Sequence, residues 1–451
     1  MRVRFIRPHL FDDRASDALE PLAFAVLAGL TPADVEVSLA DERLAPVPLD
    51  APIDLAAITV ETYTARRAYQ IADAFRGRGV PVVLGGYHPT FLPDEALAHA
   101  DAVVLGDAEA VWPTVLRDAA AGRLQRTYRG DGDPPLDGVR FDRRIFRGLR
   151  YPAVASVQVG RGCRYACDFC SIHSFYGSRV RHRPIAQVIE EVAALGRRHV
   201  LFVDDNLFID PDHARRLFRA LVPLGVRWGC QVSVDVASRP ELLDLMAASG
   251  CIAALIGFES IDADNLRQMN KAWSLKHLDL AAAAARSHRH GIMVYGSFVF
   301  GYDHDTPETI RRTVDAALDA RLFLANISPL TPMPGSRLYD RLRAARRLRF
   351  ARWWLDPGYR YGDATFMPAR MAPDELTEAC VAARRAFYAA GATVSRLVNV
   401  RANARTLRRA ALFVAANLVS RRELRAKLGR PLRAPEAEGP ACASEAFGGS
   451  H

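Results

Sequence analysis

The chain has 451 residues, half of them apolar and a quarter of them charged, with a formal net charge of +9. This length and composition exclude a disordered chain, a collagen-like fibre and a small disulfide scaffold, and they predict about three domains. Only three of the 60 basic residues are lysine, which indicates codon bias in a GC-rich genome. Because the arginines are spread along the chain and alternate with acidic residues, we expect no nucleic-acid partner.

The cysteines and the apolar runs exclude further classes of protein. The seven cysteines do not form a disulfide framework, because three of them lie within eight residues. Residues 1–8 are too short and too charged for a signal peptide and predict a first strand. The apolar run at 410–419 covers about half of the ~20 residues that a membrane span needs, and it predicts a packed core helix rather than an amphipathic surface helix. We therefore expect a cytoplasmic protein without a membrane span.

Short apolar runs alternate with helical patterns over residues 1–110. The predicted strands are Val3–Arg7, Val35–Leu39, Leu55–Val60, Val80–Leu84 and Ala102–Leu105. This alternation predicts a parallel, doubly wound sheet, in which ligands bind at the carboxyl ends of the strands. The segments expected there are polar or rich in glycine: Glu61-Thr62-Tyr63, Gly85-Gly86-Tyr87-His88 and Gly106-Asp107-Ala108-Glu109. Each of them is either a binding loop or an ordinary turn.

A stretch rich in Gly, Pro and Asp over residues 128–150 predicts a linker, after which a second set of strands begins. These strands are Ala153–Val159, Val200–Val203, Gly229–Val234, Ala253–Ile256, Met293–Phe300 and Phe323–Ser328. Six strand–helix units are typical of a full or partial barrel with its site at the carboxyl-terminal rim. The prediction is an α/β chain with a doubly wound, Rossmann-like domain over 1–135, a partial (βα)6 barrel over 150–340, a helical region over 341–432 and a disordered tail over 433–451.

The helical region carries aromatic residues among its arginines, namely Trp353, Trp354, Tyr359 and Tyr361. Two interpretations are open for them. They either cap the barrel rim and touch substrate, or they belong to a solvated, arginine-coated helical pack, which the charge favours.

Three cysteines carry the most specific signal in the chain. Cys163, Cys167 and Cys170 follow the first barrel strand with the spacing C-x3-C-x2-C. Thiolates are the ligands of iron–sulfur clusters, and a four-iron cluster usually takes four of them, so three thiolates leave one iron open for chemistry. The alternative is a structural zinc site that adds His173, although zinc sites are usually built from two paired ligand clusters.

This spacing, with Phe169 just before the third cysteine, resembles the radical S-adenosylmethionine (SAM) superfamily. The resemblance implies a barrel with a [4Fe-4S] cluster whose open iron binds SAM. It implies one-electron cleavage of SAM to methionine and a 5′-deoxyadenosyl radical, with the electron supplied by a protein of the flavodoxin or ferredoxin type. The implied SAM contacts are Phe169, Asp204, Asp205, Glu259, Ser260, Ser297 and Gly301.

A doubly wound domain ahead of such a barrel resembles the cobalamin-binding class of this superfamily, over about residues 1–340. The resemblance implies cobalamin contacts at Glu61, Thr62, Tyr63, Gly85, Gly86, His88, Gly106, Asp107 and Glu109. One departure is that the D-x-H-x-x-G motif, whose histidine ligates cobalt in many cobalamin proteins, is absent after the first strand. Cobalamin would then bind without that histidine, with His88 beside the nucleotide tail, or the domain is a relic.

With both cofactors the resemblance implies a methyltransferase that acts on an unactivated carbon of a small-molecule or lipid-like substrate. The alternatives are a cobalamin-dependent oxidative cyclisation or rearrangement without methyl transfer, and a radical SAM enzyme with a relic domain. Two further classes fit less well. A non-catalytic sensor would have damaged SAM segments, and a tRNA-modifying enzyme would carry extra cysteines or a basic β-rich module.

Overall fold

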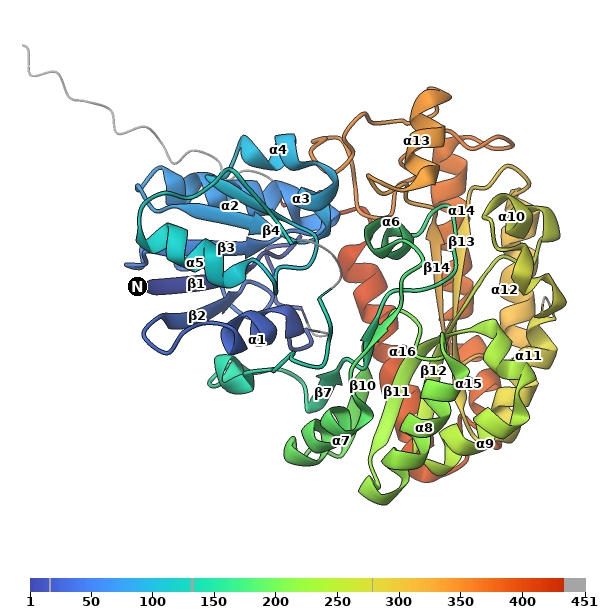
Figure 1. Ribbon diagram of the computed structural model, residues 1–451. Coiled ribbons are helices and arrows are strands. Elements are labelled where there is room, and N and C mark those ends of the chain that lie inside the picture. The colour runs from blue at the N-terminus through green and yellow to red at the C-terminus, as the bar shows by residue number, and fades with distance from the viewer. Residues whose placement is uncertain (16–17, 131–133, 278, 434–451) are drawn as a thin grey trace, which may run out of the picture.

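The computed structural model describes residues 1–15, 18–130, 134–277 and 279–433 and is an α/β protein, as predicted (Figure 1). Two six-stranded parallel sheets lie side by side, and C-terminal helices pack against the second one. The predicted disordered tail over 433–451 lies, apart from Arg433, outside the described residues.

The N-terminal sheet has the strand order β2-β1-β3-β4-β5-β6. Its strands are β1 Arg2–Arg7, β2 Glu36–Asp41, β3 Leu55–Thr59, β4 Val82–Gly85, β5 Ala102–Leu105 and β6 Thr127–Arg129. Its helices are α1 Leu22–Gly29, η1 Thr62–Thr64, α2 Ala65–Arg76, α3 Tyr87–Phe91, α4 Pro93–Leu97 and α5 Trp112–Ala120. The first five strands overlap the predicted ones, whereas β6 lies where the sequence predicts the start of a linker.

Alternate residues of β3 point to opposite faces of this sheet. Ala56 and Ile58 join the buried cluster that contains α2, whereas Leu55 and Ala57 join the cluster that contains α1 and α5. A parallel sheet that is covered on both faces is the doubly wound arrangement, and its strands are accordingly apolar throughout.

The second sheet has the strand order β14-β13-β12-β11-β10-β7, which follows the chain from one edge to the other. Its strands are β7 Val154–Val157, β10 His199–Phe202, β11 Arg227–Ser233, β12 Cys251–Glu259, β13 Met293–Phe300 and β14 Leu324–Pro329, and a small antiparallel pair is formed by β8 Gly160–Arg161 and β9 Arg181–His182. The helices of this part are η2 Arg143–Phe146, α6 Ser171–Tyr176, α7 Ile185–Ala194, α8 Pro211–Leu221, η3 Val222–Leu224, η4 Val234–Ser238, α9 Pro240–Ala248, α10 Ala263–Gln268, η5 Ala272–His277, α11 Leu280–Arg289, α12 Pro307–Asp319 and α13 Arg337–Ala344. Six parallel strands in chain order form the predicted partial barrel.

Local sequence explains where several barrel helices begin. Pro307 occupies the first turn of α12, and the hydroxyl of Thr306 accepts a hydrogen bond from the backbone N–H of Thr309 at 3.2 Å. Asp210 caps α8 in the same way, with Pro211 in its first turn. Such caps satisfy N–H groups that a helix leaves unpaired at its start.

The prediction for the aromatic residues of the C-terminal region was wrong. Trp353, Trp354 and Tyr359 are at most 1% exposed and belong to neither a helix nor a solvated surface, because they pack into the buried cluster on the α2 face of the N-terminal sheet. Large aromatic rings gain more by leaving water than by staying on an arginine-coated surface. The arginine beside them, Arg352, stays 65% exposed.

The C-terminal helices are α14 Pro373–Phe387, α15 Ala390–Leu397 and α16 Leu407–Lys427. The core-helix prediction for 410–419 was wrong as well. In α16 only Phe413 and Asn417 are buried, since the helix touches the barrel along one narrow stripe where Phe413 meets Met293 and Phe323. None of the helices in the described residues is long and apolar enough to cross a lipid bilayer.

Candidate active site

The three predicted ligand cysteines lie in the loop between β8 and α6. Figure 1 shows α6 beside the N-terminal sheet, at one end of the barrel strands. Cys163, Cys167 and Cys170 are partly buried free thiols. Gly162 leads into the loop with a φ of 89°, and a Cβ there would collide with the carbonyl oxygen of Arg179. The turn into the first cysteine therefore requires glycine.

Asp168 fastens the middle of this loop. Its carboxylate accepts a hydrogen bond from Arg341 Nη2 at 2.9 Å and another from the hydroxyl of Tyr302. Its backbone N–H donates to the carbonyl of Met269 at 3.0 Å, and its carbonyl accepts from the N–H of Leu338 at 2.9 Å. The loop is thus held through a residue between the cysteines, from the sides of β13 and α13.

Burial raises the pKa of all three thiols, that of Cys167 to about 12. Charge repulsion adds to this effect. The charge of Cys170 raises the pKa of Cys163, and the charges of Cys170 and Cys163 raise the pKa of Cys167. Such thiols become thiolates only against positive charge, which metal ions supply. In the described residues no three His, Cys, Asp or Glu side chains are drawn together as a ready metal site, so what fits a cluster with three protein ligands is the donor set itself, three half-buried thiols on one loop.

Asp204 and Asp205 follow β10 and hold the backbone that leads into the cysteines. The carboxylate of Asp204 accepts hydrogen bonds from the N–H groups of Val159 at 3.1 Å and Gly160 at 2.5 Å, and Asp205 accepts one from the N–H of Gly162 at 2.8 Å. Burial raises the pKa of Asp204 to about 7. Both carboxylates have backbone partners here, and their contact with SAM stays a prediction.

Glu259 ends β12 in a left-handed conformation with a φ of 67°, at a break in the β12–β13 register. Its Oε1 lies 3.1 Å from Nζ of Lys271, which also donates to the carbonyl of Gly257 at 2.8 Å. Ser260 accepts a hydrogen bond from the N–H of Asp262 and so begins the turn into α10. The sequence analysis did not identify Lys271 as a site residue. Its rarity could have indicated it, because the chain has only three lysines.

The remaining predicted SAM residues share this rim of the barrel. Ser297 of β13 lies beside Gly257 of β12, and Gly301 follows the end of β13. Gly301 has a φ of 117°, and a Cβ there would lie 2.6 Å from the ring of Phe366. Phe169 packs against the barrel core. The fold therefore gathers the cysteines and all the predicted SAM residues at the carboxyl ends of neighbouring parallel strands.

A cavity of about 300 Å³ opens between the carboxyl ends of the N-terminal strands and the start of the barrel. It lies where the strand order reverses between β1 and β3, which is where doubly wound sheets bind ligands. Its lining includes the predicted residues Glu61, Gly85, Gly86, Gly106, Asp107 and Glu109 on one side and Gln158, Arg161, Phe175 and Tyr176 of the barrel part on the other. Gly86 has a φ of 108°, and a Cβ there would lie 2.9 Å from the carbonyl oxygen of Val60, so the loop passes this close to β3 only as glycine.

Three predicted cobalamin residues, Thr62, Tyr63 and His88, lie outside the lining of this cavity. The hydroxyl of Tyr63 is hydrogen-bonded to that of Thr331 at 3.1 Å. His88 is fully buried, with Nε2 3.0 Å from Oε1 of Glu95 and Nδ1 3.3 Å from the hydroxyl of Thr62. Both ring nitrogens of His88 therefore have protein partners.

Asp107 and Glu109 bind two arginines of the barrel part, a contact that sequence reasoning missed. Arg161 lies 3.2 Å from Asp107 and 2.6 Å from Glu109, and Arg181 lies 2.6 Å from Asp107. Burial alone would lower the pKa of Arg161, but Glu109 and Asp107 raise it. Because Arg161 stands two residues before Cys163, this network ties the cavity to the cysteine loop. The sequence signal that could have indicated this contact is the arginine in Gly160-Arg161-Gly162-Cys163, two residues before the first cysteine.

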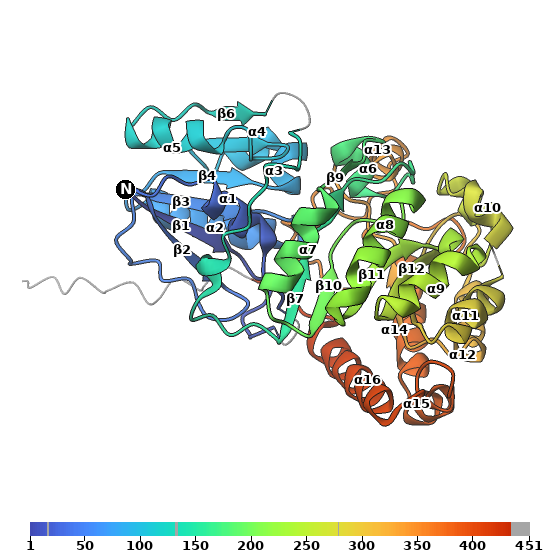
Figure 2. The same ribbon diagram turned by 60° about the horizontal axis from the view of Figure 1, so that its bottom comes forward.

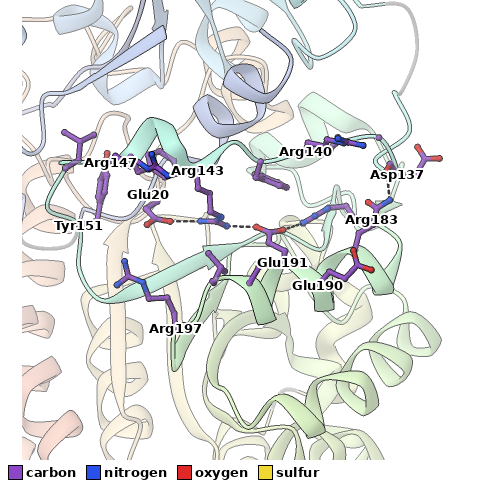
Figure 3. A pocket seen from close by; sticks show the side chains of 18 residues that line it. Glu20, Asp137, Arg140, Arg143, Arg147, Tyr151, Arg183, Glu190, Glu191 and Arg197 are labelled. Carbon is purple, nitrogen blue, oxygen red and sulfur yellow. Dashed lines mark hydrogen bonds and ion pairs between the residues drawn. The ribbon is translucent and has the colours of Figure 1, made fainter. Parts of the chain in front are cut away.

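A larger hollow of about 920 Å³ lies beside α7 and the segment that joins the two sheets (Figure 3). In its lining Arg143 pairs with Glu20 at 2.5 Å and with Glu191 at 2.6 Å, and Glu191 also pairs with Arg183 at 2.6 Å. None of the predicted site residues lines this hollow. These paired charges join the connecting segment to the barrel, and the candidate active site is the rim and cavity described above.

Comparison with known proteins agrees with this geometry. Residues 157–317 match the radical SAM superfamily. The chain is 31% identical over 390 residues to bacteriochlorophyllide d C-12(1)-methyltransferase of Chlorobaculum tepidum, covering 84% of each chain. It is 30% identical to the C-8(2)-methyltransferase of the same organism, covering 76% of this chain and 80% of the other. Among solved structures, the radical SAM methyltransferase TsrM from Kitasatospora setae, with cobalamin and a [4Fe-4S] cluster bound, matches with a TM-score of 0.62 at 19% identity, covering 88% of this chain and 90% of that one.

Proposed function

The chain belongs to the radical SAM superfamily, and we propose that it is a cobalamin-dependent methyltransferase that acts on an unactivated carbon of a small-molecule or lipid-like substrate. One observation carries the proposal. The cavity at the switch point of the N-terminal sheet opens toward the barrel, and Arg161 connects its wall to the cysteine loop. The two similar bacteriochlorophyllide methyltransferases support methyl transfer as the reaction.

The cysteine loop holds the cluster in this proposal, through Cys163, Cys167 and Cys170. With SAM bound, the cluster supplies one-electron cleavage of SAM. Asp204 and Asp205 act as positioning residues, because their carboxylates hold the backbone from Val159 to Gly162. The buried pair of Lys271 and Glu259 offers a cation and an anion that complement the carboxylate and ammonium groups of SAM.

The cavity between the sheets holds cobalamin in this proposal. Cobalamin supplies a transferable methyl group when it is bound. Glycines at 85, 86 and 106 let the backbone approach a ligand closely. The rings of Phe24, Trp112 and Phe175 give the cavity an apolar wall against which a ligand can pack. No histidine of a D-x-H-x-x-G motif is present, and His88 is engaged at both nitrogens, so we infer binding without a histidine on cobalt.

The electron donor and the substrate complete the proposal. Radical SAM enzymes need a reductant, and we infer a protein of the flavodoxin or ferredoxin type. A chlorophyll-type tetrapyrrole is the first substrate to test, because the two relatives named above act on bacteriochlorophyllide d.

The first test is an absorption spectrum for bound corrinoid. The full chain is expressed with cobalamin supplied and purified without oxygen, and we expect near-stoichiometric corrinoid beside the iron–sulfur absorption. The loaded enzyme is then given reductant, SAM with a deuterated methyl group and the tetrapyrrole. We expect a product that carries the labelled methyl group, detected by mass spectrometry.

Two results would count against the proposal in different ways. A chain that binds no corrinoid but still cleaves SAM is a radical SAM enzyme with a relic domain. A chain that binds corrinoid and converts substrate to a product without the label performs an oxidation rather than a methylation.

A further inference from the structure

The outward face of α15, α16 and the segment between them is unusually apolar. Eight of the eleven large apolar side chains that are exposed in the described part of the chain lie here: Val394, Val398, Val400, Leu407, Leu412, Val414, Leu418 and Val419. We refer to these eight residues, with the exposed arginines among them, as the C-terminal face. Soluble proteins rarely expose contiguous apolar patches without a binding role.

In the middle of α16 the polar side chain is buried and apolar side chains are exposed, which is the reverse of an ordinary surface helix. Asn417 is the only polar residue between 410 and 419, yet it is buried and donates hydrogen bonds to the carbonyls of Phe323 and Phe413. Its neighbour Leu418 is 55% exposed. A surface helix normally turns its polar residues outward, so this outward face suits an apolar or amphipathic medium better than water.

The segment that carries the C-terminal face is strongly basic, although its Arg430 and Arg433 pair with acidic residues of the N-terminal part. Residues 389–433 contain eleven basic residues and a single acidic one, Glu423, so this segment alone accounts for the net positive charge of the protein. Glu423 is paired with Lys427 at 2.6 Å. Exposed arginines flank the apolar stretch of α16 at both ends: Arg401, Arg405 and Arg408 before it, and Arg422 and Arg425 after it.

The face is held rigidly on the barrel. Arg396 of α15 is fully buried, and its guanidinium donates to the carbonyls of Leu322 and Phe323 at 2.9 and 3.0 Å and to Asn417 of α16 at 3.0 Å. Arg409 donates to carbonyls at the amino-terminal ends of β12 and β13. The cysteines lie at the opposite ends of these strands, and Figure 2 shows α15 and α16 at an outer edge of the molecule. The face is therefore separate from the candidate active site.

We propose that the C-terminal face docks on an anionic lipid bilayer. Its apolar side chains enter the headgroup region, and its arginines bind lipid phosphates, with α16 lying in the plane of the surface rather than crossing it. A second copy of the chain fits this face less well, because a symmetric contact would place two sets of arginines against each other. The docking does not depend on the reaction or on the cofactors.

Flotation of the cluster-loaded full chain with vesicles tests this inference. The vesicles are phosphatidylcholine alone or phosphatidylcholine with phosphatidylglycerol, at low and at high salt. We expect binding to the mixed vesicles at low salt, at least tenfold weaker binding to pure phosphatidylcholine, and weakening by salt, since each arginine near an anionic surface contributes roughly fivefold. Leu412→Asn/Leu418→Asn and Arg408→Glu/Arg422→Glu should each weaken binding by at least tenfold.

Arg117→Glu/Arg126→Glu is the matched control, because it makes the same charge change at exposed residues of the N-terminal domain. It should leave vesicle binding within about twofold, since charge far from the contact is screened. Equal loss in this control, or no binding to mixed vesicles at low salt, overturns the proposal. A chain that binds heparin or RNA but not vesicles has a polyanion site instead. A dimer in solution that Leu412→Asn/Leu418→Asn dissociates assigns the face to a second copy.

Discussion

The two six-stranded parallel sheets of this protein differ in strand order, and the order decides where each sheet can hold a ligand. In the N-terminal sheet β1 lies between β2 and β3, so the chain winds first one way and then the other, and the cavity opens at that reversal. In the barrel sheet the strands follow chain order, so the sheet curls and its strand ends converge on one rim. The same alternation of strands and helices thus produces two kinds of site, which Arg161 joins.

The largest effect is expected in the cysteine loop of the barrel. Cys163→Ala, Cys167→Ala and Cys170→Ala should each abolish SAM cleavage, because a cluster with fewer thiolates loses its anchoring. Iron and sulfide content and formation of 5′-deoxyadenosine measure the effect. Cys380→Ala, at a buried cysteine of α14 away from the loop, should keep its iron. Full iron content in any of the three loop variants would contradict the assignment.

The connection between the two sites is the next target. Arg161→Met removes the arginine that pairs with Glu109 and leaves Asp107 with Arg181 alone, and breaking a buried pair costs about 3–5 kcal/mol in the free energy of unfolding. Urea unfolding measures the loss. Arg144→Met removes an exposed ion pair with Asp142 and should cost far less than Arg161→Met, because solvent screens an exposed pair. Similar losses for the two variants would show that the ion pairs of Arg161 stabilise the fold no more than an exposed ion pair does.

In the barrel part, the buried His288 of α11 should make stability depend on pH. Burial, helped by the charge of Arg321, lowers the pKa of His288 to about 4, and its Nδ1 lies 3.0 Å from Nδ2 of Asn399. The unfolded chain binds a proton near pH 6.5, so the stabilisation is complete above that pH and is lost as the pH falls toward 4. At pH 5 the loss is about 2 kcal/mol.

His288→Gln keeps an acceptor for Asn399 but removes the titrating group. Its urea midpoint should therefore fall less than that of the parent between pH 7.5 and pH 5. Equal shifts in the two proteins would show that His288 does not titrate in this window.

The smallest effect is expected in the N-terminal sheet. Gly86→Ala puts alanine at a φ of 108° and a ψ of −168°, a region that essentially only glycine occupies, at a cost of about 1–3 kcal/mol, and places a Cβ against Val60. We expect roughly tenfold weaker corrinoid binding with SAM cleavage retained. Gly122 also has a positive φ, of 64°, but open space around its Cβ position, and Gly122→Ala should bind corrinoid normally. Loss of SAM cleavage in Gly86→Ala would mean that the two sites are not separable.

Much of the fold and part of the candidate site were predictable from local sequence. Strand positions follow from apolar runs, and the start of α12 follows from Thr306 and Pro307. The cysteine spacing indicates a cluster because all three ligands come from one loop. Glycines after β4 and β5 mark loops that line the cavity. Each of these features depends on residues that are close in sequence.

Other features depend on partners that are far apart in the sequence. Asp107 and Glu109 line the cavity, as their loops predict, and they also pair with Arg161 and Arg181, which come more than fifty residues later; their contact with cobalamin stays a prediction. His88 is hydrogen-bonded to Glu95, and Glu95 also accepts a hydrogen bond from Trp354 of the C-terminal region. Asn417 is buried because its side chain accepts a hydrogen bond from the guanidinium of Arg396 and donates one to the carbonyl of Phe323.

The sequence by itself determined the α/β class, the order of the elements and the grouping of three cysteines in one loop, because periodicity and spacing are local properties of the chain. Only the tertiary structure decided which loops share a cavity, which charges pair across the two sheets and which side of α16 faces water. Those choices depend on burial and on pairing between distant segments, and buried charges and polar groups take whichever partner the packed fold brings within reach.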